Sequence, residues 1–109
     1  MCIAYIGNIL YDKKLLDDNR CLIIFGCGLY GKKVAKYLEE KGMRNNILCF
    51  CDANKGVTEE EVMGIPVWEP SRVCEHYPQA DYLISGKYSG EMYKFLIKNH
   101  IGKIHILVF

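Results

Sequence analysis

The chain has 109 residues, 14 basic against 13 acidic side chains, and a formal net charge of +1 at pH 7. This length allows one domain with a single core but is short for a two-domain dehydrogenase. The charge balance gives no reason to expect nucleic acid or an anionic membrane as a partner, and no apolar stretch approaches the roughly 18 residues that span a bilayer. Because the N-terminus lacks a basic segment followed by a cleavage site, we predict a cytoplasmic protein.

Residues 1–20 mix apolar positions with a charged stretch over residues 12–20. We predict that they form an amphipathic leader, partly helical, packed on the edge of a sheet. Residues 21–109 are predicted to form a single Rossmann-like nucleotide-binding domain.

A glycine-rich turn follows the first predicted strand, residues 21–25. Gly26, Gly28 and Gly31 form the pattern G-x-G-x-x-G directly before a predicted helix over residues 29–41. In this setting the first glycine permits a tight turn, the second lets a phosphate approach the backbone, and the third lets the helix lie close to the sheet. The alternative is that the glycines serve strand-to-helix packing alone.

An acidic residue, Asp52, follows the second predicted strand over residues 46–51. Its carboxylate can accept hydrogen bonds from ribose hydroxyls and would repel a 2′-phosphate, so a dinucleotide ligand would be NAD rather than NADP. The alternative is that Asp52 only caps a loop.

The later elements alternate in type along the chain. In order they are a strand over 64–68, a helix over 70–76, a strand over 81–85, a helix over 91–99 and a strand over 103–109. Pro66 indicates an edge position for its strand. The alternation predicts an α/β fold with a doubly wound, parallel, five-stranded sheet in the order 3-2-1-4-5.

The ligand of such a sheet lies over the carboxyl ends of the first and fourth strands, where the winding direction reverses. The loop over residues 85–89 offers donors for a phosphate or sugar there, and Trp68 could stack on a base. The three histidines fall outside this predicted crevice, so no catalytic residue is assigned. The candidate cofactor-binding residues are Gly26, Cys27, Gly28, Leu29, Tyr30, Gly31, Asp52, Ala53, Trp68, Ser85 and Gly86.

Three of the six cysteines, Cys21, Cys49 and Cys51, lie in apolar strand-like runs. We predict that they are buried, with Cys49 and Cys51 on one face of their strand. No C-x-x-C pair and no compact Cys/His spacing is present, so no metal site is expected.

The glycine-rich run over residues 21–38, the segment Phe50–Lys55 and the segment Gly64–Val67 together resemble small Rossmann-like domains of bacterial polysaccharide and nucleotide-sugar pathways. Such domains form the N-terminal part of sugar O-acyltransferases and are appended to some sugar methyltransferases and glycosyltransferases. The resemblance implies that Gly26, Gly28 and Gly31 cradle phosphates and that Asp52 contacts the nucleoside. The acyltransferases carry their catalytic residues in a hexapeptide-repeat domain, and because this chain has no such repeats we do not expect an autonomous acyltransferase.

Three classes of function follow. The first is a module that binds NAD or a nucleotide-sugar and acts with a partner chain or an absent domain. The second is a small enzyme whose site is completed at a homodimer interface. The third is a degenerate Rossmann domain that serves protein association only. The glycine pattern and Asp52 favour the first over the third, and the lack of acid–base residues in the predicted crevice favours it over the second.

Overall fold

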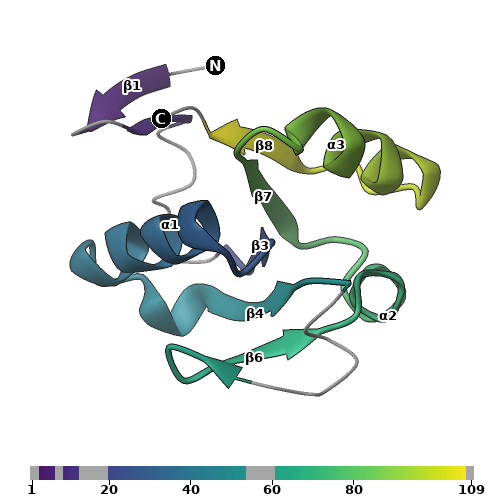
Figure 1. The fold of residues 1–109 in the computed structure, drawn as a ribbon, viewed down its shortest axis with the longest axis horizontal. Coiled ribbons are helices and arrows are strands. Elements are labelled where there is room, and N and C mark those ends of the chain that lie inside the picture. Colours follow the sequence, from purple (N-terminus) through teal and green to yellow (C-terminus); the bar gives the residue numbers. More distant parts are fainter. Residues whose placement is uncertain (1–2, 7–8, 13–19, 54–60, 108–109) are drawn as a thin grey trace.

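Six strands form one sheet in the order β5-β6-β4-β3-β7-β8 in the computed structural model, which describes residues 3–6, 9–12, 20–53 and 61–107 (Figure 1). These strands are β3 (Leu22–Phe25), β4 (Ile47–Cys51), β5 (Glu61–Val62), β6 (Ile65–Trp68), β7 (Asp81–Ser85) and β8 (Ile104–Leu107). The connecting helices are α1 (Leu29–Glu40), the 3-10 helix η2 (Arg44–Asn46), α2 (Pro70–His76) and α3 (Ser89–Lys98). The architecture is α/β and broadly Rossmann-like.

The five strands expected from the sequence pair in parallel as β6-β4-β3-β7-β8. The prediction of a five-stranded, fully parallel sheet was nevertheless wrong, because β5 adds a sixth strand antiparallel to β6. At two residues, β5 is too short to show an alternating pattern. Met63 and Gly64, with φ angles of 56° and 73°, connect it to β6, and two positive φ angles in a two-residue hairpin loop are the signature of a type I′ turn.

Pro66 therefore does not lie on an edge strand, contrary to the expectation. β6 has β4 on one side and β5 on the other. The ladder between β6 and β4 begins at Val67, one residue after Pro66. Proline is tolerated here because its missing N–H falls outside the pairing with β4.

Helices cover both faces of the sheet: α1 lies on one side, and α2 and α3 lie on the other (Figure 1). Alternate residues of β3 face opposite sides, so Leu22 and Ile24 join the α1 cluster while Ile23 joins the α2–α3 cluster. The α1 face is completed by Val34, Ala35 and Leu38 from the helix. Among the described residues, no helix is long and apolar enough to cross a bilayer.

The thiols of Cys49 and Cys51 are buried together in the α2–α3 cluster, as their spacing predicted. Cys21 was expected to be buried but is exposed, because it precedes β3 rather than lying inside it. Burial raises the pKa of Cys49 from its ordinary value of 9.0 to about 12 and raises that of Cys51 well above 9.0. Folded Cys49 keeps its proton at pH values where an unfolded thiol loses it. The contribution of this buried thiol to the free energy of unfolding is therefore fully present below about pH 9 and is lost as the pH rises towards 12.

We expect a thiol-alkylating reagent to modify Cys21 at mildly alkaline pH while Cys49 stays unmodified in the native chain, because only the thiolate reacts. Peptide mass spectrometry after brief labelling measures both positions. Labelling in denaturant, which should modify both, is the control. Equal native labelling of Cys49 and Cys21 would contradict the described burial.

The described part of residues 1–20 contains two strands, β1 (Ile3–Ile6) and β2 (Ile9–Asp12). They pair antiparallel, with Ile6 opposite Ile9, and β2 contacts β8. The expectation of partly helical structure was therefore wrong for these residues. Both segments are rich in β-branched and aromatic residues, and the intervening Gly7-Asn8 is a pair typical of short hairpins. The charged positions 13–19 lie outside the described residues.

Candidate functional site

A crevice opens at the carboxyl ends of β3, β4 and β7, and it has two lobes. The glycine-loop lobe has a volume of about 540 Å³, and the acidic lobe has a volume of about 410 Å³. The glycine-loop lobe is lined by Gly28, Leu29, Tyr30, Gly31, Ser85, Gly86 and Lys87. The acidic lobe is lined by Cys51, Ala53, Glu69, Pro70, Glu91 and Phe95. Both lobes share Phe25, Gly26, Asp52, Tyr88 and Met92.

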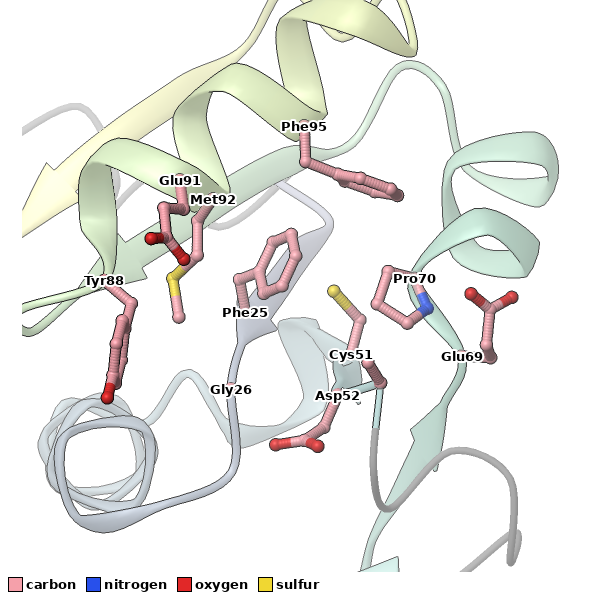
Figure 2. Close-up of a pocket in the computed structure, with 11 residues that line it drawn as sticks. Phe25, Gly26, Cys51, Asp52, Glu69, Pro70, Tyr88, Glu91, Met92 and Phe95 are labelled. Carbon is pink, nitrogen blue, oxygen red and sulfur yellow. The ribbon is translucent and has the colours of Figure 1, made fainter.

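Because they share these five lining residues, the two lobes lie side by side. Figure 2 shows Tyr88 and Met92 approaching from the α3 side and Pro70 from the α2 side, with Gly26 and Asp52 between them. A ligand that fills both lobes therefore passes over Gly26 and Asp52. This is the switch point at which doubly wound sheets bind ligands.

Each glycine of the G-x-G-x-x-G loop has a different structural situation. Gly26 has a φ angle of +92°, and its N–H donates to the carbonyl of Cys51 at 2.7 Å. A Cβ on Gly31 would lie 2.0 Å from the Gly26 carbonyl oxygen, so α1 packs too closely on this turn to allow a side chain. Gly28 has a φ of −79°, and a Cβ there would meet nothing within 4 Å. The fold therefore requires glycine at positions 26 and 31 but not at 28.

We expect Gly31→Ala to destabilise the chain by about 3 kcal/mol or more, because the helix must move away from the Gly26 carbonyl. The matched variant Gly28→Ala should cost at most about 1 kcal/mol, the difference between glycine and alanine at a helix N-cap. Denaturant unfolding followed by circular dichroism measures both. Equal stability of the two variants would contradict the close packing of α1 on this turn.

Asp52 is fixed at the end of β4 by its own backbone and by the glycine loop. Its N–H donates to the Trp68 carbonyl at 3.0 Å. Its Oδ2 lies 3.4 Å from the Cys27 backbone nitrogen and 3.4 Å from the Cys27 thiol sulfur, both of which donate to it. The carboxylate thus sits between the two lobes, held against the turn that precedes α1.

Two further carboxylates line the acidic lobe. Glu69 is the N-cap of α2, where its oxygens accept hydrogen bonds from the backbone of Ser71 at 3.0 Å and of Arg72 at 3.2 Å. Glu91 lies in the first turn of α3, where the helix dipole favours a negative charge. The lobe therefore disfavours a phosphate and suits a group that brings hydroxyls or no charge.

Apolar side chains form the walls of the acidic lobe. Phe25 and Phe95 meet edge to face with ring centroids 5.9 Å apart, and Pro70 and Met92 line the same space. Such walls, with a carboxylate at their margin, suit a flat ring attached to a hydroxylated sugar.

The structure brings nine of the eleven sequence-predicted site residues to the crevice. They are Gly26, Gly28, Leu29, Tyr30, Gly31, Asp52, Ala53, Ser85 and Gly86. Cys27 is buried behind the loop against Asp52. Trp68 lines neither lobe, because its ring packs 4.3 Å from the Arg72 guanidinium and edge to face with His76.

Sequence reasoning left several lining residues unassigned. Phe25 and Cys51 are the last residues of their strands, a position that could have indicated them. Glu69, Glu91 and Met92 lie at or near the starts of α2 and α3, close to the same end of the sheet. No motif marks these three, and only the packing of the helices brings them to the crevice.

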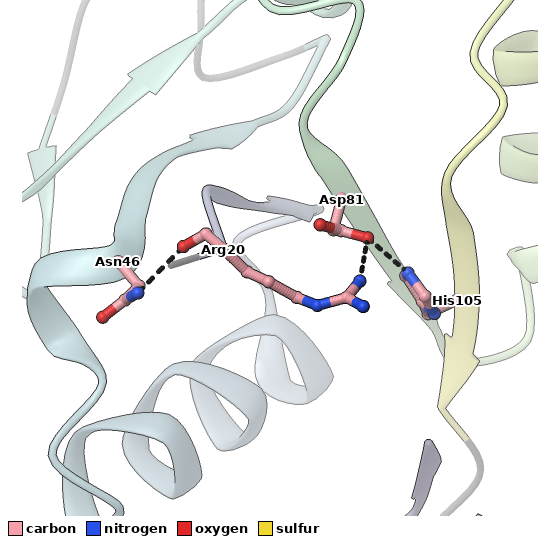
Figure 3. Close-up of polar contacts among 4 residues, drawn as sticks. All are labelled: Arg20, Asn46, Asp81 and His105. Carbon is pink, nitrogen blue, oxygen red and sulfur yellow. Dashed lines mark hydrogen bonds and ion pairs between the residues drawn. The ribbon is translucent and has the colours of Figure 1, made fainter. Parts of the chain in front are cut away.

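The histidines of the chain line neither lobe. His105 contacts the amino end of β7, away from the crevice. There Asp81 Oδ1 accepts hydrogen bonds from His105 Nε2 and Arg20 Nη1, each at 2.8 Å (Figure 3). Asn46 donates to the Arg20 carbonyl at 2.9 Å. Because Asp81 is buried, these two partners satisfy a charge that would otherwise be costly there. Among the described residues, no three His, Cys, Asp or Glu side chains group to hold a metal ion.

The family model that matches this chain is the PglD N-terminal domain, over residues 21–85. The chain belongs to the PglD N-terminal domain family. This confirms the resemblance to the N-terminal domains of bacterial sugar O-acyltransferases, and it indicates a role in bacterial sugar modification. Neither the curated proteins nor the solved structures provide a match.

The matched PglD N-terminal domain span runs from the residue before β3 to the end of β7. It includes the glycine loop and Asp52. Lys87, Tyr88, Glu91 and Met92 lie beyond it, so the family match carries no information about the α3 side of the crevice.

Proposed function

We propose that this chain is a nucleotide-binding module that takes NAD or a nucleotide-sugar and acts in bacterial sugar modification together with a partner chain. In this proposal the phosphates occupy the glycine-loop lobe, the ribose lies at Asp52, and the base enters the apolar part of the acidic lobe. Histidine side chains lie outside both lobes, and Glu69 is engaged in capping α2. We therefore infer that a partner supplies the chemistry.

The observation that carries this proposal is the open space at Gly28. If the glycine pattern served packing alone, each glycine would have a steric reason to lack a side chain. Gly26 and Gly31 have such a reason, but Gly28 borders the lobe with nothing within 4 Å of the position a Cβ would occupy. A ligand that approaches the backbone closely accounts for a glycine at this position.

The charges of the crevice narrow the ligand class. Asp52 would accept hydrogen bonds from ribose hydroxyls and repel a 2′-phosphate, which favours NAD over NADP. Glu69 and Glu91 add negative charge to the same lobe, so the part of the ligand that enters it should carry no phosphate. Both NAD and a nucleotide-sugar meet this condition when their phosphates lie in the glycine-loop lobe.

We expect NAD or a UDP-sugar or CMP-sugar to raise the thermal unfolding midpoint, since a ligand that binds only the native state stabilises it. Asp52→Asn should weaken the affinity about tenfold, which corresponds to about 1.4 kcal/mol for a hydrogen bond to a charged acceptor. Gly28→Ala should weaken it by a similar factor because its methyl group occupies the phosphate position. Calorimetric titration measures these affinities.

Glu75→Gln is the matched control for Asp52→Asn, since Glu75 is an exposed acid on α2 that lines neither lobe. It should bind as the wild type does. Wild-type affinity in both Asp52→Asn and Gly28→Ala would show that the site is placed wrongly. A thermal unfolding midpoint that none of these ligands raises would contradict nucleotide binding and favour a domain that serves protein association only.

A further inference from the structure

The N-terminus of α1 and Asp52 together do not give the glycine-loop lobe the positive charge that a bound phosphate requires. The N-terminus of α1 supplies roughly half a positive charge, while the Asp52 carboxylate, which also lines this lobe, supplies a full negative charge. The Cys27 N–H, which would otherwise be a donor for the ligand, is directed at Asp52 Oδ2. Without a further cation, the groups that surround the lobe give a net negative charge.

Among the described residues that line this lobe, Lys87 is the one with a cationic side chain. It is exposed and belongs to the connection between β7 and α3. Its Nζ lies 5.1 Å from the centroid of the Tyr88 ring. At this distance the ring attracts the ammonium group, and Tyr88 itself lines both lobes.

The backbone beside Lys87 is held in place by close contacts. Gly86 has a φ angle of +85°, and a Cβ there would lie 2.9 Å from Cδ2 of Tyr30, so the Tyr30 ring packs directly on this glycine. The Gly86 carbonyl accepts hydrogen bonds from the Ser89 hydroxyl at 2.6 Å and from the Ser89 N–H at 3.2 Å. The position from which Lys87 extends is therefore fixed relative to α1.

We propose that Lys87 binds a phosphate group in the glycine-loop lobe, with Tyr88 holding its ammonium at the lobe when no ligand is present. The proposal rests on the proposed function for the presence of a phosphorylated ligand, but it assigns a residue that neither the glycine pattern nor the family match indicates. Lys33 does not have this role, because it lines neither lobe and its Nζ lies 5.7 Å from the Tyr30 ring centroid.

The test uses inorganic pyrophosphate as the probe and calorimetric titration of the whole chain. Lys87→Met keeps an unbranched side chain but removes the charge. We expect it to bind pyrophosphate at least about fivefold more weakly than the wild type, the effect of losing one partly exposed charge pair. Lys87→Arg should keep most of the affinity. Added salt should weaken wild-type binding more than binding by Lys87→Met, because screening acts on the charge that the variant lacks.

Lys33→Met is the matched control, since it removes the same charge from a lysine that also lies beside a tyrosine, and it should bind as the wild type does. Equal affinity of Lys87→Met and the wild type would overturn the inference. So would an equal loss in Lys33→Met, or no pyrophosphate binding by the wild type at high millimolar concentration. If nucleotide affinity falls in Asp52→Asn but not in Lys87→Met, this inference alone is overturned. If the chain binds pyrophosphate but no nucleotide, the proposed function alone is overturned.

Discussion

The close contact between α1 and the end of β3 is the constraint on which the site depends. A side chain on Gly31 would collide with the Gly26 carbonyl, so the first turn of the helix rests directly on the turn that leaves the strand. This contact fixes the glycine loop against the tip of β4, where the Gly26 N–H bonds the Cys51 carbonyl and Asp52 Oδ2 accepts from Cys27. The crevice exists because the carboxyl ends of β3 and β4 and the start of α1 are held in this arrangement.

The two adjoining lobes of the crevice have different electrostatic preferences. The glycine-loop lobe has a helix N-terminus and Lys87, whereas the acidic lobe has Asp52, Glu69, Glu91 and apolar walls. A ligand with phosphate at one end and an uncharged, hydroxylated ring at the other matches both halves. Under the proposed function, charge as well as shape would orient the nucleotide. Asp52 lines both halves, so its substitution is expected to weaken binding of both parts of the ligand.

Much of the fold followed from local patterns. The sequence predicted the strand, glycine turn and helix over residues 21–41, and it predicted the order of the parallel strands. It could do so because each buried strand is an apolar run bounded by polar or glycine residues. β5 and the antiparallel pair β1 and β2 were not predicted, since β5 is too short for a pattern and the residues of β1 and β2 were expected to be partly helical. Trp68 was expected at the crevice but lines neither lobe. A residue at a strand end can turn towards the crevice or towards the following helix, and here its ring contacts Arg72 and His76 of α2. Lys87 and Tyr88 belong to the loop over residues 85–89, which was expected at the crevice, whereas Glu91 and Met92 reach it through the packing of α3, which no motif records.

The central claim is that a nucleotide lies across the glycine loop and Asp52, and amide NMR spectra recorded during addition of NAD or a UDP-sugar test it most directly. The account predicts saturable chemical-shift changes at the amides of Gly28, Gly31 and Asp52. It predicts little change at Asp81, at the amino end of β7, or at His105, which contacts it. Changes centred on Asp81 and His105, or no saturable change at all, would contradict it.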